Sequence, residues 1–198
     1  MSEPTQASKQ VGPPQAKSAD AGRRRLLQGG LSAAPLLMTV VSRPALGGGS
    51  NGSRCYSPSG FVSMPTSEHG QPQFCTGRTP GFWKQSQKFN EWPYPYLPVA
   101  KNGKPATKFS DVFTPVGPYA GKTLLEVLGL MGGPPDPVGR HIVAALLNAA
   151  KGWTPVLTVL AVKAIWSQYI QFGYYEPTAG VKWYHDQIVD YLKSTMPL

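Results

Sequence analysis

The stretch CTGRTPGFWK, residues 75–84, combines a cysteine, a Thr-Pro pair, a Pro-Gly break and a Phe-Trp pair. A cysteine can form a crosslink, threonine before proline is a typical helix start, and large aromatic side chains anchor a core. We therefore expect this stretch to fix a crosslink, a chain reversal and a core anchor at one place. It predicts architecture and contains no catalytic pattern.

Helix signals dominate the chain after this stretch. One helix is expected to begin at Pro80 and continue through Phe89, whereas the six prolines between Asn90 and Gly121 forbid a regular helix there. Four further helices follow from capping residues, apolar stripes and terminal glycines: Thr123 to Gly132-Gly133 with a Thr123/Glu126 capping box, Asp136-Pro137 to Gly152, Thr158 to Phe172 with Gly173 closing it, and about Val181 to Thr195.

The expected fold is therefore mainly α. A small domain of about four helices over residues 122–198 is preceded by a long Pro/Gly-rich irregular half over residues 61–121, with one disulfide. Residues 48–60 are rich in Gly and Ser and are predicted to be a flexible linker into this domain. The single domain thus spans residues 61–198.

The first 47 residues differ in composition from the rest. All 21 aromatic residues lie after position 55, and residues 1–22 are polar without an apolar period, so we expect disorder there. A basic cluster, a weakly apolar run over residues 26–41 and small residues up to Gly47 then follow the order of an export signal. Cleavage is expected after Gly47, so residues 1–47 are interpreted as lead-in and signal.

The basic cluster resembles a twin-arginine export signal, in which paired arginines are followed by two hydrophobic residues; the residues concerned are Arg23, Arg24, Arg25, Leu26 and Leu27. The resemblance implies export of a folded protein through transient contact with the export machinery. Gln28 stands where that motif often has lysine, so the general secretory route remains an alternative. An uncleaved anchor is a second alternative, although a spanning helix needs about 20 apolar residues.

Two cysteines, Cys55 and Cys75, are the only ones in the chain. In an oxidising compartment they would form one disulfide, and closing a loop of this length stabilises by about 3 kcal/mol in the chain-entropy model. Two free thiols, or a metal pair with His69, are the alternatives, but neither matches a recognised ligand spacing such as CxxC. We expect no metal and no cofactor.

Charge and spacing exclude several functions. Beyond residue 47 the chain holds 13 Lys and Arg against 8 Asp and Glu, which is mildly basic and not a nucleic-acid footprint. His185 with Asp186 or Asp190 could supply an acid and a base, while a solvated helix face is the simpler interpretation. No HExxH, GxSxG or SxxK pattern is present, so no catalytic residue is assigned.

Aromatic residues are too many for a single core stripe. Most are expected to pack in the core, but Trp92, Tyr94 and Tyr96 alternate with prolines that would hold their rings apart. We interpret these three residues as a candidate stacking surface for sugars or peptides.

Residues 75–152 resemble a recurrent module of exported bacterial proteins. The motif residues are Cys75, Gly81 to Lys84, Leu124, Leu125 and the helix His141 to Ala149. Some relatives carry Asn-His-Pro after Trp-Lys, where this chain has Gln85-Ser86-Gln87. The resemblance implies an extracytoplasmic domain of unassigned activity. We therefore expect a periplasmic, secreted or cell-surface module that binds an envelope protein or glycan without catalysis. It is expected to touch the membrane only through its signal and to bind no nucleic acid. The alternative is a polysaccharide hydrolase or lyase that uses His185.

Overall fold

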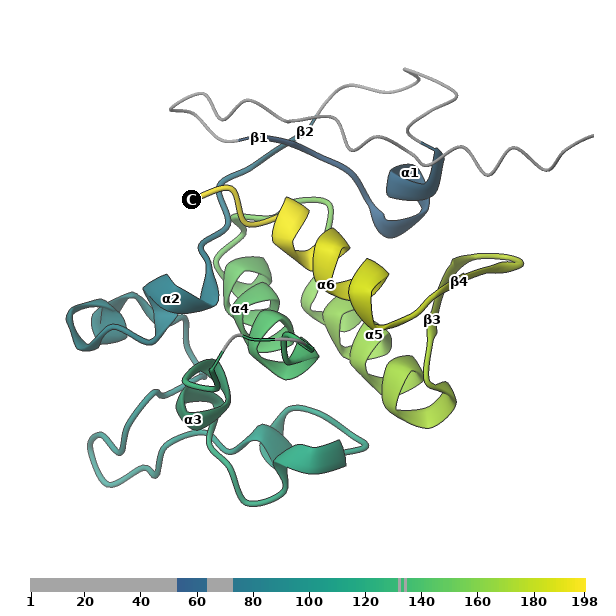
Figure 1. Cartoon of the computed structure of the whole chain (residues 1–198). Coiled ribbons are helices and arrows are strands. Elements are labelled where there is room, and N and C mark those ends of the chain that lie inside the picture. Colours follow the sequence, from purple (N-terminus) through teal and green to yellow (C-terminus); the bar gives the residue numbers. More distant parts are fainter. Residues whose placement is uncertain (1–52, 64–72, 132, 134) are drawn as a thin grey trace, which may run out of the picture. The chain divides into compact units, whose positions relative to one another are not determined.

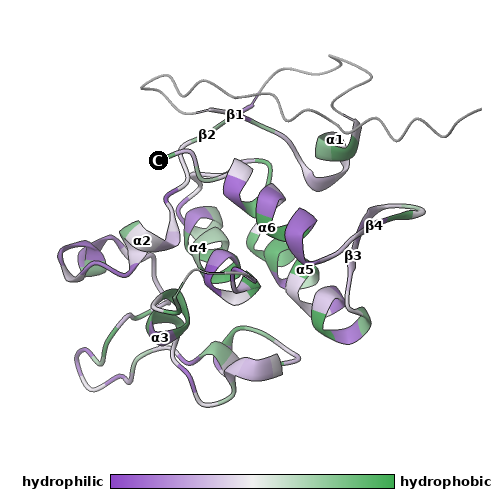
Figure 2. Cartoon of the chain, in the orientation of Figure 1, coloured by the Kyte–Doolittle hydropathy of each residue, from purple (hydrophilic) through white to green (hydrophobic). Residues whose placement is uncertain are grey.

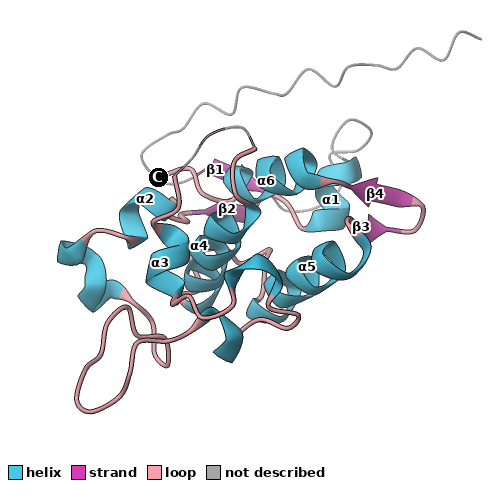
Figure 3. Cartoon of the chain, turned by 60° about the horizontal axis from the view of Figure 1, so that its bottom comes forward, coloured by secondary structure: helices cyan, strands magenta, loops and turns pink. Residues whose placement is uncertain are grey.

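The computed structural model describes residues 53–63, 73–131, 133 and 135–198. Helices and loops make up most of this part, and its strands are confined to two short antiparallel pairs (Figure 3). The elements are β1 (Ser53–Cys55), α1 (Pro58–Ser63), β2 (Gln73–Cys75), α2 (Pro80–Trp83), η1 (Ser86–Glu91), η2 (Phe109–Asp111), η3 (Gly117–Tyr119), α3 (Leu124–Leu128), α4 (Val138–Ala150), α5 (Val159–Phe172), β3 (Tyr175–Thr178), β4 (Val181–Trp183) and α6 (His185–Ser194), where η denotes a 3₁₀ helix. The prediction of a mainly helical fold is confirmed.

Helix α4 is the centre of the domain. It contacts α2 and α3 on one side and α5 and α6 on the other (Figure 1). A continuous run from His141 to Asn148 is buried, as expected of a helix that is apolar on nearly all sides. The neighbouring α6 carries both hydrophilic and hydrophobic residues, because only one of its faces packs inward (Figure 2).

Local capping signals place several helix ends correctly. Thr123 accepts a hydrogen bond from the amide of Glu126 at 3.2 Å, and the Glu126 carboxylate accepts from the Thr123 amide at 2.6 Å, so the predicted capping box is confirmed. Thr158 caps α5 in the same way through the Ala161 amide, and Gly173 ends it in the left-handed conformation. The predicted bounds of α5 are therefore confirmed.

Three predicted helices are shorter in the structure. α2 ends at Trp83 and is followed by η1, and α3 ends at Leu128 with Gly129 as its C-cap. The helix predicted from Val181 begins only at His185, because residues 181–183 form β4 and pair with β3 across a turn at Gly180. The buried Trp183 side chain, which packs on Phe61 and Tyr191, holds β4 against the domain.

The predicted flexible linker is wrong for residues 53–60. These residues form β1 and the first half of α1 because Cys55 is joined to Cys75 by a disulfide, with the two Cα atoms 5.7 Å apart. Residues 48–52 lie outside the described part, as do the lead-in and signal. The disulfide is confirmed, and it excludes both the free thiols and the metal pair with His69 as alternatives for these cysteines.

The stretch 75–84 is fixed by the side chain of Asn148, which is fully buried on α4. Its Oδ1 accepts hydrogen bonds from the Arg78 amide at 2.9 Å and from the indole Nε1 of Trp83 at 3.0 Å. Its Nδ2 donates to the Arg78 carbonyl at 2.9 Å. The Asn148 side chain therefore supplies the hydrogen bonds that a neighbouring strand would supply in a sheet. The Arg78 amide, the Arg78 carbonyl and the Trp83 indole are all paired in this way.

Two further segments close around the same backbone. The Thr76 amide donates to the Trp153 carbonyl at 2.9 Å, and Gly77 and Thr79 exchange hydrogen bonds with Leu198. A Cβ atom at Gly77 would collide with the Thr195 carbonyl, so only glycine permits this close approach. The stretch 75–84 is thus held by chain segments from the end of α4 and from beyond α6.

Substitution of Asn148 tests this central contact. Asn148→Ala leaves the Arg78 amide and carbonyl and the Trp83 indole buried without partners, so we expect a loss of about 4 kcal/mol in the free energy of unfolding, measured by urea denaturation. Asn90→Ala, an exposed asparagine in η1, is the matched control and should change stability by less than about 0.5 kcal/mol. Equal effects of the two substitutions would contradict a central role for Asn148.

Candidate functional site

The three aromatic residues predicted to form a stacking surface do not share one surface. Trp92 is only 8% exposed, and its indole Nε1 donates to the Trp83 carbonyl at 3.1 Å. Tyr94 is 83% exposed and lies 5.8 Å from the Lys104 ammonium, whereas Tyr96 is half-buried against the core. The prediction is corrected for Trp92, which buries its ring in the Trp83 cluster, and Tyr94 alone of the three is fully available to a ligand.

His185 begins α6 and is half-buried, and both of its ring nitrogens are engaged. Nε2 lies 2.9 Å from the carbonyl oxygen of Asp136, which can only accept, so Nε2 carries the hydrogen. In the neutral ring Nδ1 then accepts from the Tyr169 hydroxyl at 3.2 Å. Asp186 is exposed, and Asp190, on the same helix, is half-buried. The proposed acid-base pairing with either carboxylate is therefore not favoured by the geometry.

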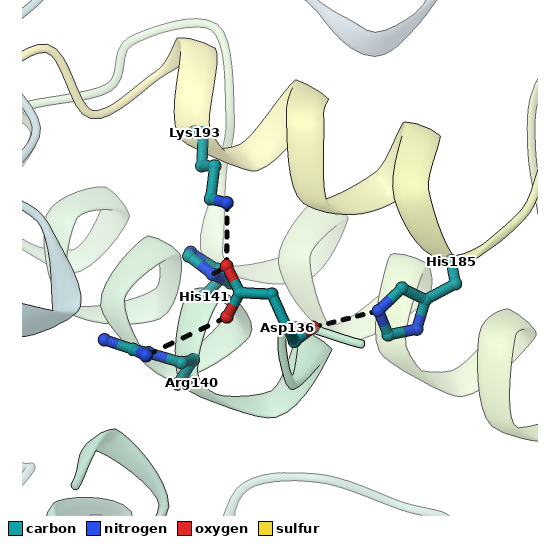
Figure 4. Close-up of polar contacts among 5 residues, drawn as sticks. All are labelled: Asp136, Arg140, His141, His185 and Lys193. Carbon is teal, nitrogen blue, oxygen red and sulfur yellow. Dashed lines mark hydrogen bonds and ion pairs between the residues drawn. The ribbon is translucent and has the colours of Figure 1, made fainter. Parts of the chain in front are cut away.

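Asp136 is the residue around which the charged groups gather (Figure 4). Its Oδ2 lies 2.7 Å from the Lys193 ammonium and 2.9 Å from Nε2 of His141, and its Oδ1 lies 3.8 Å from Arg140. The contact with Lys193 joins Asp136, just before α4, to the last turn of α6, and the contact with His141 joins it to α4 itself. The Asp136 carbonyl holds His185 in the first turn of α6. We call these five residues the Asp136 cluster.

The hydrogen bonds of the cluster set the charges of its members. Partial burial opposes ionisation of Asp136, but hydrogen bonds from Lys193 and His141 outweigh it and hold the pKa of this carboxyl below its usual value. Desolvation lowers the pKa of His141 although Asp136 opposes this effect. His141 is 4% exposed, and its Nδ1 is buried without a hydrogen-bond partner in the described ranges. A proton on Nδ1 would have no acceptor, so the neutral ring is favoured.

This arrangement acts as a clamp on α6. Two donors, His141 and Lys193, converge on Oδ2 of one carboxylate. The unpartnered ring nitrogen of His141 is buried, where a substrate has no access. The sequence suggested Asp136 as a helix cap, which is wrong: Pro137 is the N-cap, and the Asp136 side chain is turned to His141 and Lys193. The five-residue spacing between Asp136 and His141 is the sequence signal that could have found part of this cluster. Lys193 gave no such signal, because it lies on α6, far along the chain.

Among the described residues no group of three or more His, Cys, Asp or Glu side chains could hold a metal ion. No helix within the described ranges is long and apolar enough to cross a membrane. The signal residues Arg23, Arg24, Arg25, Leu26 and Leu27 lie outside the described part, and their role stays a prediction.

Comparison with known proteins assigns neither family nor activity. No family model matches the chain, and neither a curated protein nor a solved structure does so. Functional conclusions therefore depend on the residues and contacts of this chain.

The His141 environment predicts how stability depends on pH. Because the folded-state pKa of His141 lies below the ordinary value of 6.5, the unfolded chain takes up a proton first, and stability should fall as the pH decreases below that value. Asp136, whose pKa lies below its ordinary 3.8, adds a second loss only at more acidic pH.

Thermal unfolding of wild type and His141→Gln across this pH range measures the effect. We expect His141→Gln to lower stability at neutral pH. Above the pH range in which carboxylates titrate, the stability of this variant should also depend less on pH than that of the wild type. His185→Gln replaces another histidine and is the control. In this variant the fall in stability with decreasing pH that His141 causes should remain. An unchanged slope in His141→Gln would contradict the assignment.

Proposed function

We propose that this protein is an exported module of the periplasm or cell surface that binds or scaffolds an envelope component without catalysis. The observation that carries the proposal is the Cys55–Cys75 disulfide, which uses both cysteines of the chain and fixes the entry into the domain. Disulfides of this kind persist in oxidising compartments and are rare in the cytosol. The export signal predicted from residues 1–47 agrees with that location.

The described titratable groups support a binding role over a catalytic one. In the Asp136 cluster, the carboxylate is hydrogen-bonded to His141 and paired with Lys193, and the Asp136 carbonyl accepts from His185, so these contacts hold α4 and α6 together. Catalytic acids and bases need access to the proton they transfer, and the ring nitrogens of His141 and His185 are either buried or engaged in hydrogen bonds within the fold. The partner we propose is an envelope protein or glycan; nucleic acid is not one, and membrane contact is limited to the signal and to passage through the export machinery.

Export is tested by the paired arginines. In cells expressing the full chain, Arg23→Lys combined with Arg24→Lys should retain the protein in the cytosol with free thiols, whereas Arg25→Lys should still yield a shortened, oxidised product outside it. Fractionation followed by thiol alkylation and mass spectrometry measures both properties. Recovery of wild-type protein as a full-length, reduced chain in the cytosol would contradict the proposal, and normal export of the double variant would instead favour the general secretory route.

A second candidate function deserves a test because the Tyr169 hydroxyl contacts His185 at the half-buried start of α6. A hydroxyl and an imidazole together could serve a polysaccharide hydrolase or lyase, with Asp186 or Asp190 as the carboxylate. We expect no release of reducing or unsaturated sugar ends from cell-wall or capsule material by the wild type. Activity that disappears in both His185→Ala and Tyr169→Phe, but persists in the exposed-site control Tyr94→Phe, would establish the enzyme instead.

A further inference from the structure

Arg78 lies in the middle of the stretch 75–84, and its backbone is fixed on both sides by Asn148. Its guanidinium Cζ lies 5.2 Å from the ring centroid of Phe82 and 5.8 Å from that of Trp153. Cation–π contacts of this kind hold a guanidinium in place without neutralising its charge. The Arg78 side chain is therefore positioned from its backbone to its charged end.

This guanidinium has no acidic partner in the part of the chain that the structure describes. Its Nε is buried without a hydrogen-bond partner, so its terminal nitrogens are the groups left to bind an external acceptor. Arginines that are ordered by packing and unpaired are suited to planar oxyanions, because their donors form a fork that fits carboxylate or phosphate.

Two lysines extend the positive charge around Arg78. The Lys88 ammonium lies 5.1 Å from the Phe82 centroid, and the Lys151 ammonium lies 5.4 Å from the Trp153 centroid. Within the described ranges Glu91 is the one acid paired with this group, at 3.7 Å from Lys151. Both side chains of that ion pair are partly exposed, so the pair is weak. We call Arg78, Phe82, Lys88, Lys151 and Trp153 the Arg78 surface.

The Arg78 surface is built by three separate segments of the chain. Arg78 and Phe82 come from the beginning of α2 and the residues before it, Lys88 from η1, and Lys151 and Trp153 from the residues after α4. α2 and α4 are in direct contact (Figure 1). Trp153 is anchored by stacking on the buried Trp83, with 5.4 Å between their ring centroids. The surface therefore needs no rearrangement to present three cations together.

We propose that the Arg78 surface binds an acidic polysaccharide through its carboxylate groups. Three cations against one acid among the described residues fit a ligand that carries repeated negative charge, and the guanidinium fork of Arg78 fits a planar carboxylate. A lipid surface fits less well, because none of the exposed large hydrophobic residues (Phe74, Tyr94, Val99, Met131, Leu160, Phe172, Tyr184, Leu198) belongs to this surface. The inference rests on the proposed location outside the cytosol, where such glycans occur, and it names the class of partner.

Binding of polygalacturonate tests the proposal. Protein purified from cells expressing the full chain should bind this polymer in calorimetry at low salt and bind it more weakly at high salt, because ionic strength screens charge pairs. The fully methyl-esterified polymer keeps the sugar rings but lacks the charges and should not bind. Absence of binding by the wild type, or equal binding of the ester, would overturn the proposal.

Substitutions identify the surface. Arg78→Ala should weaken binding about tenfold, as expected for loss of a charge-assisted hydrogen bond, and Lys88→Ala and Lys151→Ala about threefold each. Lys101→Ala removes an equal charge from an exposed turn elsewhere and should leave affinity unchanged. Glu91→Gln removes the one opposing charge and should tighten binding about twofold, a gain that a general loss of structure would not produce. An unchanged affinity of Arg78→Ala would overturn the proposal.

Two other probes separate the alternatives. Polyglutamate and phosphatidylglycerol vesicles both carry negative charge without uronate rings. If polyglutamate bound as tightly as polygalacturonate, with the same dependence on Arg78, the Arg78 surface would be assigned to an acidic peptide instead. Equally tight binding of the vesicles would assign it to a lipid surface. Failure here and failure of export are distinguishable. An exported chain that does not bind the uronate polymer overturns only this inference, and a cytosolic chain that binds it overturns only the location.

Discussion

The buried amide of Asn148 is the interaction on which the domain depends. Its oxygen accepts hydrogen bonds from the Arg78 amide and the Trp83 indole, and its nitrogen donates to the Arg78 carbonyl. It therefore organises residues 76–79, which lie between β2 and the short helix α2. A buried polar group is tolerated only when it is paired, and here each atom of the amide finds a partner. Because Asn148 lies on the central α4, fixing it there also fixes the entrance of the domain relative to the core.

Around this contact the aromatic side chains form separate clusters, each of which holds a part of the chain with little regular structure. Trp83 packs with Trp92 and Trp153, and Trp166 packs on Phe109 and Tyr119 and donates its indole hydrogen to the Pro115 carbonyl at 2.7 Å. Large rings bury much surface for each residue ordered, and an indole donor satisfies carbonyl groups that have no ladder partner. Proline-rich segments can therefore pack tightly without strands.

The two polar centres of the domain differ in what they leave available. In the Asp136 cluster, positive and negative groups compensate one another and connect α4 to both ends of α6, so the cluster stabilises the fold. At the Arg78 surface the backbone is fully satisfied while the charged end of the side chain lacks an acidic partner in the described part. Charges that lie against one another support structure, and a positioned cation without an acidic partner is suited to binding. This contrast is the physical basis for placing recognition beside α2 and not at His185.

The sequence by itself determined the mainly helical class, the Thr123 and Thr158 caps, the bounds of α5 and the pairing partners of the disulfide, because each of these depends on residues close in sequence or on the only two cysteines present. Tertiary structure alone decided that Val181–Trp183 is a strand, that residues 53–60 are ordered and that Trp92 is buried, since in each case a distant partner overrides the local preference. The same holds for both polar centres: Arg78 meets Asn148 from 70 residues away and Asp136 meets Lys193 from another helix, and no local period records which side chains a fold will bring together.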